Sequence, residues 1–176
     1  MTSWHMMSKA SLTAIDSRIL RILQEDGRIT NAELAERVGL SPSPCLRRVR
    51  LLEEAGIIRR YVTLLDPDAL GLGVAAFVEI RLGPKNTATA AAFETAIKKY
   101  TEIMECHIMT GEYDYLLRIV VPDIPSLRAF VMNQLLSVPG VEATRSSFSL
   151  GQVKYTTALP LDGEERPSPR KRRLDR

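Results

Sequence analysis

Three arginines, Arg47, Arg48 and Arg50, stand almost side by side in the second quarter of the chain. A guanidinium group can bond a guanine edge with two hydrogen bonds and also binds phosphates, so this cluster has the chemistry to read double-stranded DNA. At helical spacing Arg47 and Arg50 share one side with Ser43, and Arg48 flanks them. The other side is apolar and should face inward; its members are Cys45, Leu46, Val49 and Leu52. The segment therefore predicts a helix with one free, cationic face.

Around these arginines the sequence has the pattern of two short helices joined by a turn. Thr30 and Glu33 have the spacing of a capping box, in which the hydroxyl accepts a bond from a free N–H group of the first turn and the carboxylate accepts one from the N–H of the capping residue itself. Gly39 suits the left-handed residue that ends a helix, and Ser41 can cap the next helix, which opens with prolines. An amphipathic helix over residues 13–24 should support both.

This pattern predicts a helix–turn–helix domain over residues 12–57, with its second helix in the major groove of DNA. The candidate DNA contacts are Ser41, Ser43, Pro44, Arg47, Arg48 and Arg50. An ordinary helical hairpin with a solvated charged face is the alternative. The glycine turn, the paired prolines and the arginine cluster favour DNA binding.

A linker over residues 58–72 follows the helices. Residues 57–66 are rich in strand-forming side chains and end at Pro67, which predicts a strand. The edges of such a strand are unpaired, so two chains could pair there. Arg59 and Arg60 either touch phosphates or belong to a solvated linker.

From residue 73 onward the apolar pattern changes to a period of two, then alternates between strand and helix spacing. The predicted order is strand, helix, strand, strand, helix, strand, over residues 74–82, 87–100, 103–109, 113–121, 123–136 and 141–150, with a last strand at 153–157. This is the order of ferredoxin-like domains, so we predict an α+β fold with such a domain over residues 73–161. Helices cover one face of the sheet, and we expect a second copy of the chain to bury the other.

Cys106 and His107 are adjacent and invite comparison with a nucleophile and its base. Neighbouring side chains of a strand point to opposite faces, so these two cannot meet. The chain has only two histidines, which supports a metal site poorly. We therefore predict no enzyme, no catalytic or metal-binding residue and no cofactor, and we expect the Cys45 thiol to be buried.

Composition sets the broad class of the protein. The net charge is +3 and 45% of the residues are hydrophobic, which suffices for packed cores and leaves function to the placement of charges. No apolar run approaches the roughly 20 residues of a membrane helix. No secretory signal is visible, and two cysteines in different predicted domains fit a reducing cytoplasm.

The two ends differ from the rest of the chain. Residues 1–11 are expected to be a loose, flexible start. Residues 162–176 contain a basic cluster and little to bury, which predicts disorder. This tail is either an arm that adds non-specific affinity for phosphates or simply a solvated end.

Longer segments of the chain resemble one known family. The segments are IDSRILRILQEDGRITNAELAERVGLSPSPCLRRVRLLEEAGII, VTLLDP, MECHIMTGEYDYLLRIVVPD and SVPGVEATRS. They make residues 12–161 similar to the leucine-responsive regulatory protein / AsnC family, also called feast/famine regulators. The resemblance implies a helix–turn–helix of transcriptional regulators, a ferredoxin-like domain that binds a free amino acid, and homodimers that assemble to octamers.

The resemblance also implies where the amino acid binds, near the loop between the second and third strands of the sheet. The implied effector residues are Thr110, Gly111, Tyr113, Asp114 and Tyr115, with Ser146, Ser147 and Phe148 of the fourth strand. Asp114 would bind the α-amino group, and Gly111 would permit a close backbone approach. Taken without the family, Asp114 is equally well a buried turn carboxylate. The serines differ from the bulkier groups of the leucine regulator, which leaves the side chain of the effector open.

The favoured hypothesis is a sequence-specific transcriptional regulator that responds to an amino acid and controls genes of amino-acid metabolism, in the cytoplasm on the nucleoid. Linkage between effector and DNA typically amounts to ~1–3 kcal/mol. A dimer should read half-sites about one helical turn apart. The alternative is an architectural, nucleoid-associated protein with little effector control, whose binding would be salt-dependent and independent of sequence.

Overall fold

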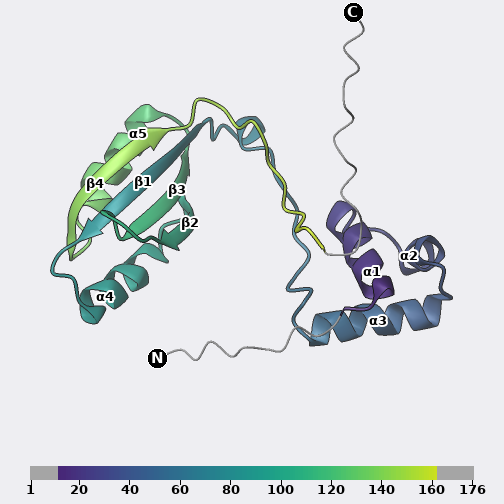
Figure 1. Ribbon diagram of the computed structural model, residues 1–176. Coiled ribbons are helices and arrows are strands. Elements are labelled where there is room, and N and C mark those ends of the chain that lie inside the picture. Colours follow the sequence, from purple (N-terminus) through teal and green to yellow (C-terminus); the bar gives the residue numbers. More distant parts are fainter. Residues whose placement is uncertain (1–11, 162–176) are drawn as a thin grey trace, which may run out of the picture. The chain divides into compact units, whose positions relative to one another are not determined.

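The computed structural model describes residues 12–161, so the predicted loose start at 1–11 and basic tail at 162–176 lie outside the described residues. The chain forms two compact units. One joins the residues up to Thr63 with those from Tyr155 onward, and the other is Leu64–Lys154. Residues 155–161 therefore belong with the helices, whereas the predicted boundary assigned them to the sheet domain (Figure 1).

Three helices make the first unit: α1 (Ala14–Glu25), α2 (Asn31–Val38) and α3 (Pro42–Glu54). α1 and α2 each begin with a capping box, formed by Thr13 with Asp16 and by Thr30 with Glu33. Gly39 ends α2 with a φ of 74°, a left-handed conformation that favours glycine. The predicted helix–turn–helix is confirmed, because local caps and the glycine turn specify where each helix begins and ends.

The helices close around a small apolar core. Ile19 of α1, Ala35 of α2 and Cys45 of α3 are fully excluded from solvent. The Cys45 thiol is thus buried, as predicted. Full burial of a large aliphatic side chain such as Ile19 contributes about 1.5–3 kcal/mol, so this shared core holds the three helices together.

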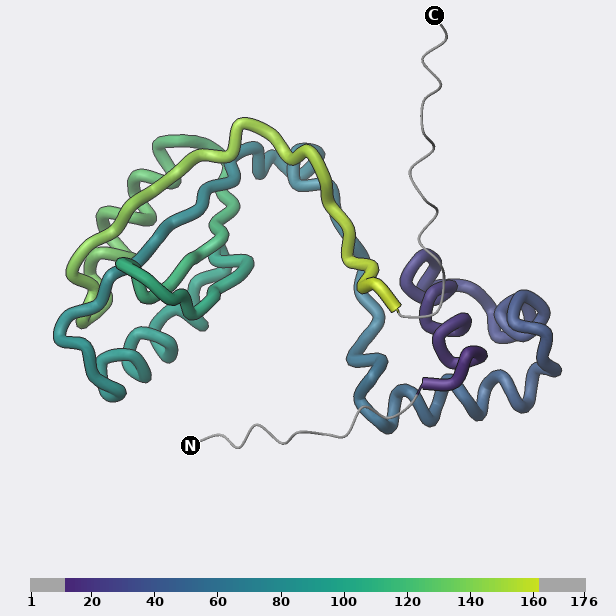
Figure 2. The backbone as a smooth tube through the Cα atoms, viewed as in Figure 1, coloured from purple at the N-terminus to yellow at the C-terminus, as the bar shows by residue number. Residues whose placement is uncertain are grey.

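The end of the described chain also packs on this unit. The Gln24 side chain donates a hydrogen bond to the Leu159 carbonyl at 3.3 Å and accepts one from the Leu159 N–H at 2.6 Å. Leu161 packs against the helical core. Figure 2 shows the last described residues reaching the helices. The helical unit is therefore assembled from both ends of the described sequence.

The linker departs from the prediction. Residues 57–66 form no strand, and a single turn of 3-10 helix, η1 (Asp68–Leu70), follows them. A strand requires a ladder of hydrogen bonds with a partner, and residues 12–161 provide none at this place. Several apolar side chains of the linker stay exposed as a result: Tyr61, Val62, Leu64 and Leu65.

A four-stranded antiparallel sheet makes the second unit. Its strands are β1 (Val74–Leu82), β2 (Ile103–Ile108), β3 (Tyr115–Val121) and β4 (Val141–Phe148), in the order β2-β3-β1-β4. The connecting helices are α4 (Thr87–Ile97) and α5 (Ile124–Phe130), and α5 continues into a π-helical turn, η2 (Val131–Leu135). This order confirms the ferredoxin-like prediction. The predicted last strand at 153–157 is wrong, because those residues pair with no described strand and Val153 is fully exposed.

The two faces of the sheet differ in character. α4 and α5 cover one face (Figure 1), where Val78, Ile80 and Leu117 are fully buried, as the period of two in β1 predicted. The other face carries charged and exposed groups, including Phe77 at 40% exposure and an ion pair between Glu79 and Arg145. No described helix is long and apolar enough to cross a membrane.

Candidate nucleic-acid interface and effector loop

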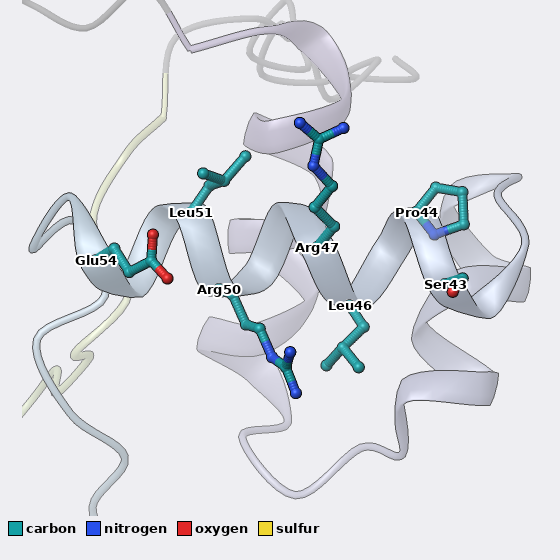
Figure 3. A pocket seen from close by; sticks show the side chains of 7 residues that line it. All are labelled: Ser43, Pro44, Leu46, Arg47, Arg50, Leu51 and Glu54. Carbon is teal, nitrogen blue, oxygen red and sulfur yellow. The ribbon is translucent and has the colours of Figure 1, made fainter.

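The free side of α3 is a shallow groove of about 490 Å³. Its lining residues are Ser43, Pro44, Leu46, Arg47, Arg50, Leu51 and Glu54. In Figure 3 Arg47 and Leu51 point to one side of the helix axis, and Arg50 and Leu46 point to the other. The groove thus combines two cations with apolar side chains on a surface that the helical core does not use.

Arg47 and Arg50 are the cations of this groove, and both are exposed. Within residues 12–161 neither makes an ion pair with a carboxylate. An unpaired guanidinium keeps all of its N–H donors for a ligand, and its fork matches phosphate oxygens and guanine edges. The two side chains are therefore available to bind DNA.

Arg48 has a different environment. Its Nη1 lies 2.8 Å from Asp16 Oδ1 and 3.3 Å from the Thr13 hydroxyl oxygen, so it ties α3 to the start of α1. Partial burial acts to raise the pKa of Asp16, but bonds from Thr13 and Arg48 outweigh it and hold that pKa below its usual value. Arg48 thus positions the helix, unlike the two arginines of the groove.

Two predictions about α3 need correction. Leu46 does not face inward: it is 38% exposed and lines the groove, because it lies about 100° around the helix from the buried Cys45. Ser41 is the N-cap residue of α3, but its hydroxyl makes no capping hydrogen bond. Its side chain is exposed and so remains a free donor beside Ser43.

The predicted effector loop joins β2 to β3, and Asp114 is its most constrained side chain. Asp114 Oδ2 accepts a hydrogen bond from the Leu82 N–H at 2.8 Å, and Oδ1 lies 3.1 Å from Lys85 Nζ. The bond from Leu82 is the largest cause that lowers the pKa of Asp114, and Lys85 adds to it. Gly111 turns the loop with a φ of 121°. Asp114 therefore presents a carboxylate that is ionised at neutral pH and held at the end of β1.

The two tyrosines of the loop lie in different surroundings. Tyr115 is 4% exposed; its ring packs on Phe93 at 4.7 Å between centroids and its hydroxyl donates to Glu94 Oε1 at 2.8 Å. Tyr113 has the Arg145 guanidinium 5.1 Å from its ring centroid. Tyr115 is thus a core residue of the helix-covered face, whereas Tyr113 has contact with a cation of β4.

The predicted effector residues of β4 lie apart from the loop within one chain. Ser146, Ser147 and Phe148 pair with Val78, Phe77 and Ala76 of β1, while Tyr115 pairs with Ile80. At roughly 3.3 Å per residue, Phe148 is about 13 Å along β1 from the position that meets the loop. Thr110 and Gly111 are exposed at the loop tip. The structure therefore brings Asp114 to Lys85 and Tyr113 to Arg145, and it leaves Phe148 away from the loop.

The sequence does not predict the contacts of Lys85 and Arg145, because the partners of both residues are distant in sequence. Lys85 follows the Gly83-Pro84 turn and meets Asp114 only when β1 and β3 pair. Arg145 meets Glu79 and Tyr113 only when β4 pairs with β1. For Arg145, cross-strand alignment of β4 with β1 is the signal that would have found it, whereas Lys85 lies in a loop for which periodicity gives no signal.

Cys106 and His107 lie on opposite faces of β2, since Cys106 pairs with the buried Leu117 and His107 with Leu116. Cys106 lies on the edge strand β2 and is exposed to solvent, but partial desolvation and then the nearby Glu94 carboxylate raise the pKa of its thiol to about 11. The described residues contain no group of His, Cys, Asp and Glu that could hold a metal ion. A thiol with this pKa is neutral at physiological pH and is a poor nucleophile.

We therefore expect Cys106 to be alkylated about a hundredfold more slowly than an ordinary exposed cysteine at pH 8, because the thiolate fraction falls tenfold per unit of pKa. The rate should rise about tenfold per pH unit up to the raised pKa. Iodoacetamide labelling followed by peptide mass spectrometry would measure it separately from Cys45. Equal rates in the native protein and in urea would contradict the assignment.

Comparison with known proteins matches both domains of the chain to domains of known families. A winged helix–turn–helix DNA-binding domain matches residues 12–59, and an Lrp/AsnC ligand binding domain matches residues 75–159. The chain is 46% identical over 150 residues to the leucine-responsive regulatory protein of Escherichia coli strain K12, covering 85% of this chain and 92% of that protein.

Solved structures of transcriptional regulators are also similar to this chain. A transcriptional regulator from Neisseria meningitidis in complex with L-Met is 45% identical, with a TM-score of 0.83 over 86% of this chain and 98% of that one. An AsnC family transcriptional regulator from Agrobacterium tumefaciens is 43% identical, with a TM-score of 0.81 over 85% and 97% of the two chains. The predictions of a DNA-binding regulator and of a protein that is not an enzyme are thereby confirmed. The chain belongs to the Lrp/AsnC family of DNA-binding transcriptional regulators, with a helix–turn–helix domain and a separate ligand-binding domain.

Proposed function

We propose that this regulator reads specific DNA through the free side of α3 and changes its DNA binding when a free amino acid occupies the sheet domain. The genes under its control are proposed to be those of amino-acid metabolism, with the protein at work in the cytoplasm on the nucleoid. The observation that carries the DNA half is the contrast within α3: Arg48 is engaged by Asp16, whereas Arg47 and Arg50 face outward without a carboxylate partner.

The proposed DNA contacts fall into two groups. Arg47 and Arg50 are the base or phosphate readers, because bidentate guanidinium contacts supply most discrimination in the major groove. The start of α3 supplies hydroxyls and a rigid first turn; these residues are Ser41, Ser43 and Pro44. Arg48 is proposed to hold α3 against α1 through Asp16 and to make no direct contact with DNA.

For the effector, the relative from Neisseria meningitidis in complex with L-Met supports a free amino acid as the ligand. We place its α-amino group at Asp114 Oδ1, where the Lys85 ammonium now lies at 3.1 Å, because one ammonium can replace another at a carboxylate. The loop tip around Thr110 and Gly111 would approach the ligand backbone. Tyr115 is buried against Phe93, so we propose that it fixes the end of the loop to the core and does not touch the ligand.

A second copy of the chain would complete this site. Ser146 follows Arg145 directly, but Ser147 and Phe148 pair with Phe77 and Ala76, about 10–13 Å along β1 from the loop, so a second chain would be needed to bring Phe148 to the ligand. The sheet face that carries Phe77 and the exposed apolar linker offer surfaces for pairing. We propose a homodimer that assembles further to an octamer, with two α3 helices spaced for half-sites about 34 Å apart.

A thermal-shift screen of the free amino acids would test the effector half of the proposal. A ligand that binds only the folded state at a hundredfold excess over its Kd adds about 2.7 kcal/mol of stability, which should raise the melting temperature by several degrees. Fluorescence anisotropy with promoter DNA should then show a change in Kd with the same amino acid. If no amino acid moves either quantity, the proposed effector class is wrong.

A further inference from the structure

Leu46 is an aliphatic residue of α3 that is exposed to solvent. Its neighbours Cys45, Val49 and Leu52 on the same helix are between 0% and 9% exposed, whereas Leu46 is 38% exposed. It belongs to neither buried cluster that residues 12–161 form. Within residues 12–161, packing in a buried core does not explain an exposed leucine beside the arginines of this groove.

Its position gives it a partner in the groove. Leu46 and Arg50 are one helical turn apart and point to the same side of α3 (Figure 3). Ser43, at the start of the helix, lines the same groove. Residues in the first half of a recognition helix are the ones that reach base edges, and Leu46 is the fifth residue of α3.

We propose that Leu46 contacts the C5-methyl group of a thymine in the major groove, next to the base or phosphate that Arg50 binds. The thymine methyl is the one apolar group that the major groove displays, and apolar side chains read it by contact. The inference rests on the proposed DNA-binding function of α3 and specifies one base that it reads. Polar neighbours alone would leave that methyl unrecognised.

Leu51 provides the matched comparison. It is also an exposed leucine of the same groove, at 52%, but it lies in the last turn of α3 and on the other side of the helix from Leu46 in Figure 3. A residue there is farther from the base edges reached by the start of the helix. Leu51→Ala should therefore leave the reading of thymine unchanged.

The test begins with selection of binding sites from a random DNA pool by the full-length protein. Each thymine of the enriched site is then replaced, one at a time, by deoxyuridine, which lacks only the methyl group. At one thymine we expect the wild-type protein to lose about fourfold in affinity, the value of one buried methyl-sized group. Leu46→Ala should lose that sensitivity, and Leu51→Ala should keep it.

The possible outcomes distinguish thymine contact by Leu46 from sequence-specific DNA binding by α3 as a whole. An enriched site at which deoxyuridine has no effect, or the same effect on wild type and Leu46→Ala, would overturn the role of Leu46 and leave DNA reading by α3 intact. A pool without any enriched sequence would overturn both. Leu46 is exposed, so the alanine variant should fold, and an unchanged melting temperature would show that its effect on binding is local.

Discussion

DNA carrying the selected target sequence should lose at least about thirtyfold of its affinity for the protein when Arg47 and Arg50 are both replaced by alanine. Each guanidinium that contacts a base edge is worth about 1–3 kcal/mol of discrimination, and both side chains face outward from α3. The loss should be greater for the selected site than for random DNA. Fluorescence anisotropy at fixed salt with both DNAs would measure it.

Arg48→Ala is the control for this pair. Arg48 bonds Asp16 and Thr13 across the helical core, and its side chain is 34% exposed, so its removal should cost less than about 1 kcal/mol of stability. Its effect on DNA affinity should be much smaller than that of the double variant. If Arg48→Ala abolished binding while the Arg47 and Arg50 double variant bound normally, the assignment of roles within α3 would be reversed.

Asp114→Asn should remove the response to the amino acid and leave binding of free protein to DNA intact. The amide can still accept the hydrogen bond of the Leu82 N–H, but it lacks the charge that we pair with the α-amino group. Loss of one partner of a close charge pair costs about 2–5 kcal/mol, so the amino acid should bind at least about thirtyfold more weakly. Isothermal calorimetry gives that Kd directly.

Asp114→Ala separates ligand binding from loop structure. It removes both the charge and the acceptor for Leu82, so it should lower the melting temperature as well as the affinity, whereas Asp114→Asn should lower mainly the affinity. Glu112→Gln is the control: Glu112 is exposed and makes only a long contact with Arg81, at 3.8 Å, so the variant should change neither the melting temperature nor the affinity for the amino acid. Normal calorimetric binding by Asp114→Asn would refute the role of this carboxylate.

The features that the sequence predicted well are local ones. Thr30 with Glu33 and the left-handed Gly39 act within a few residues, so the helix boundaries followed directly from spacing. The alternation of β1 predicted which of its side chains are buried, because a strand has only two faces. The inward-facing prediction for Leu46 is wrong because neighbouring helical residues lie about 100° apart, so an apolar residue next to the buried Cys45 need not share its face.

Non-local contacts explain the remaining differences. The expected strands at 57–66 and 153–157 need partners that residues 12–161 do not supply. The pairing of Asp114 with Lys85 depends on β1 meeting β3, which no periodicity states. The burial of Tyr115 was within reach of the sequence, because it alternates in step with the core residue Leu117.

The helical unit draws on both ends of the described chain, and this affects its synthesis on the ribosome. The two bonds between Gln24 and Leu159 and the packing of Leu161 on the helical core cannot form until the whole sheet domain has been made. A nascent chain that has emerged only as far as α3 therefore has all three helices but lacks the contacts that Leu159 and Leu161 make with them. Truncation before Tyr155 would leave the helices in that same unfinished state, even though all three are present.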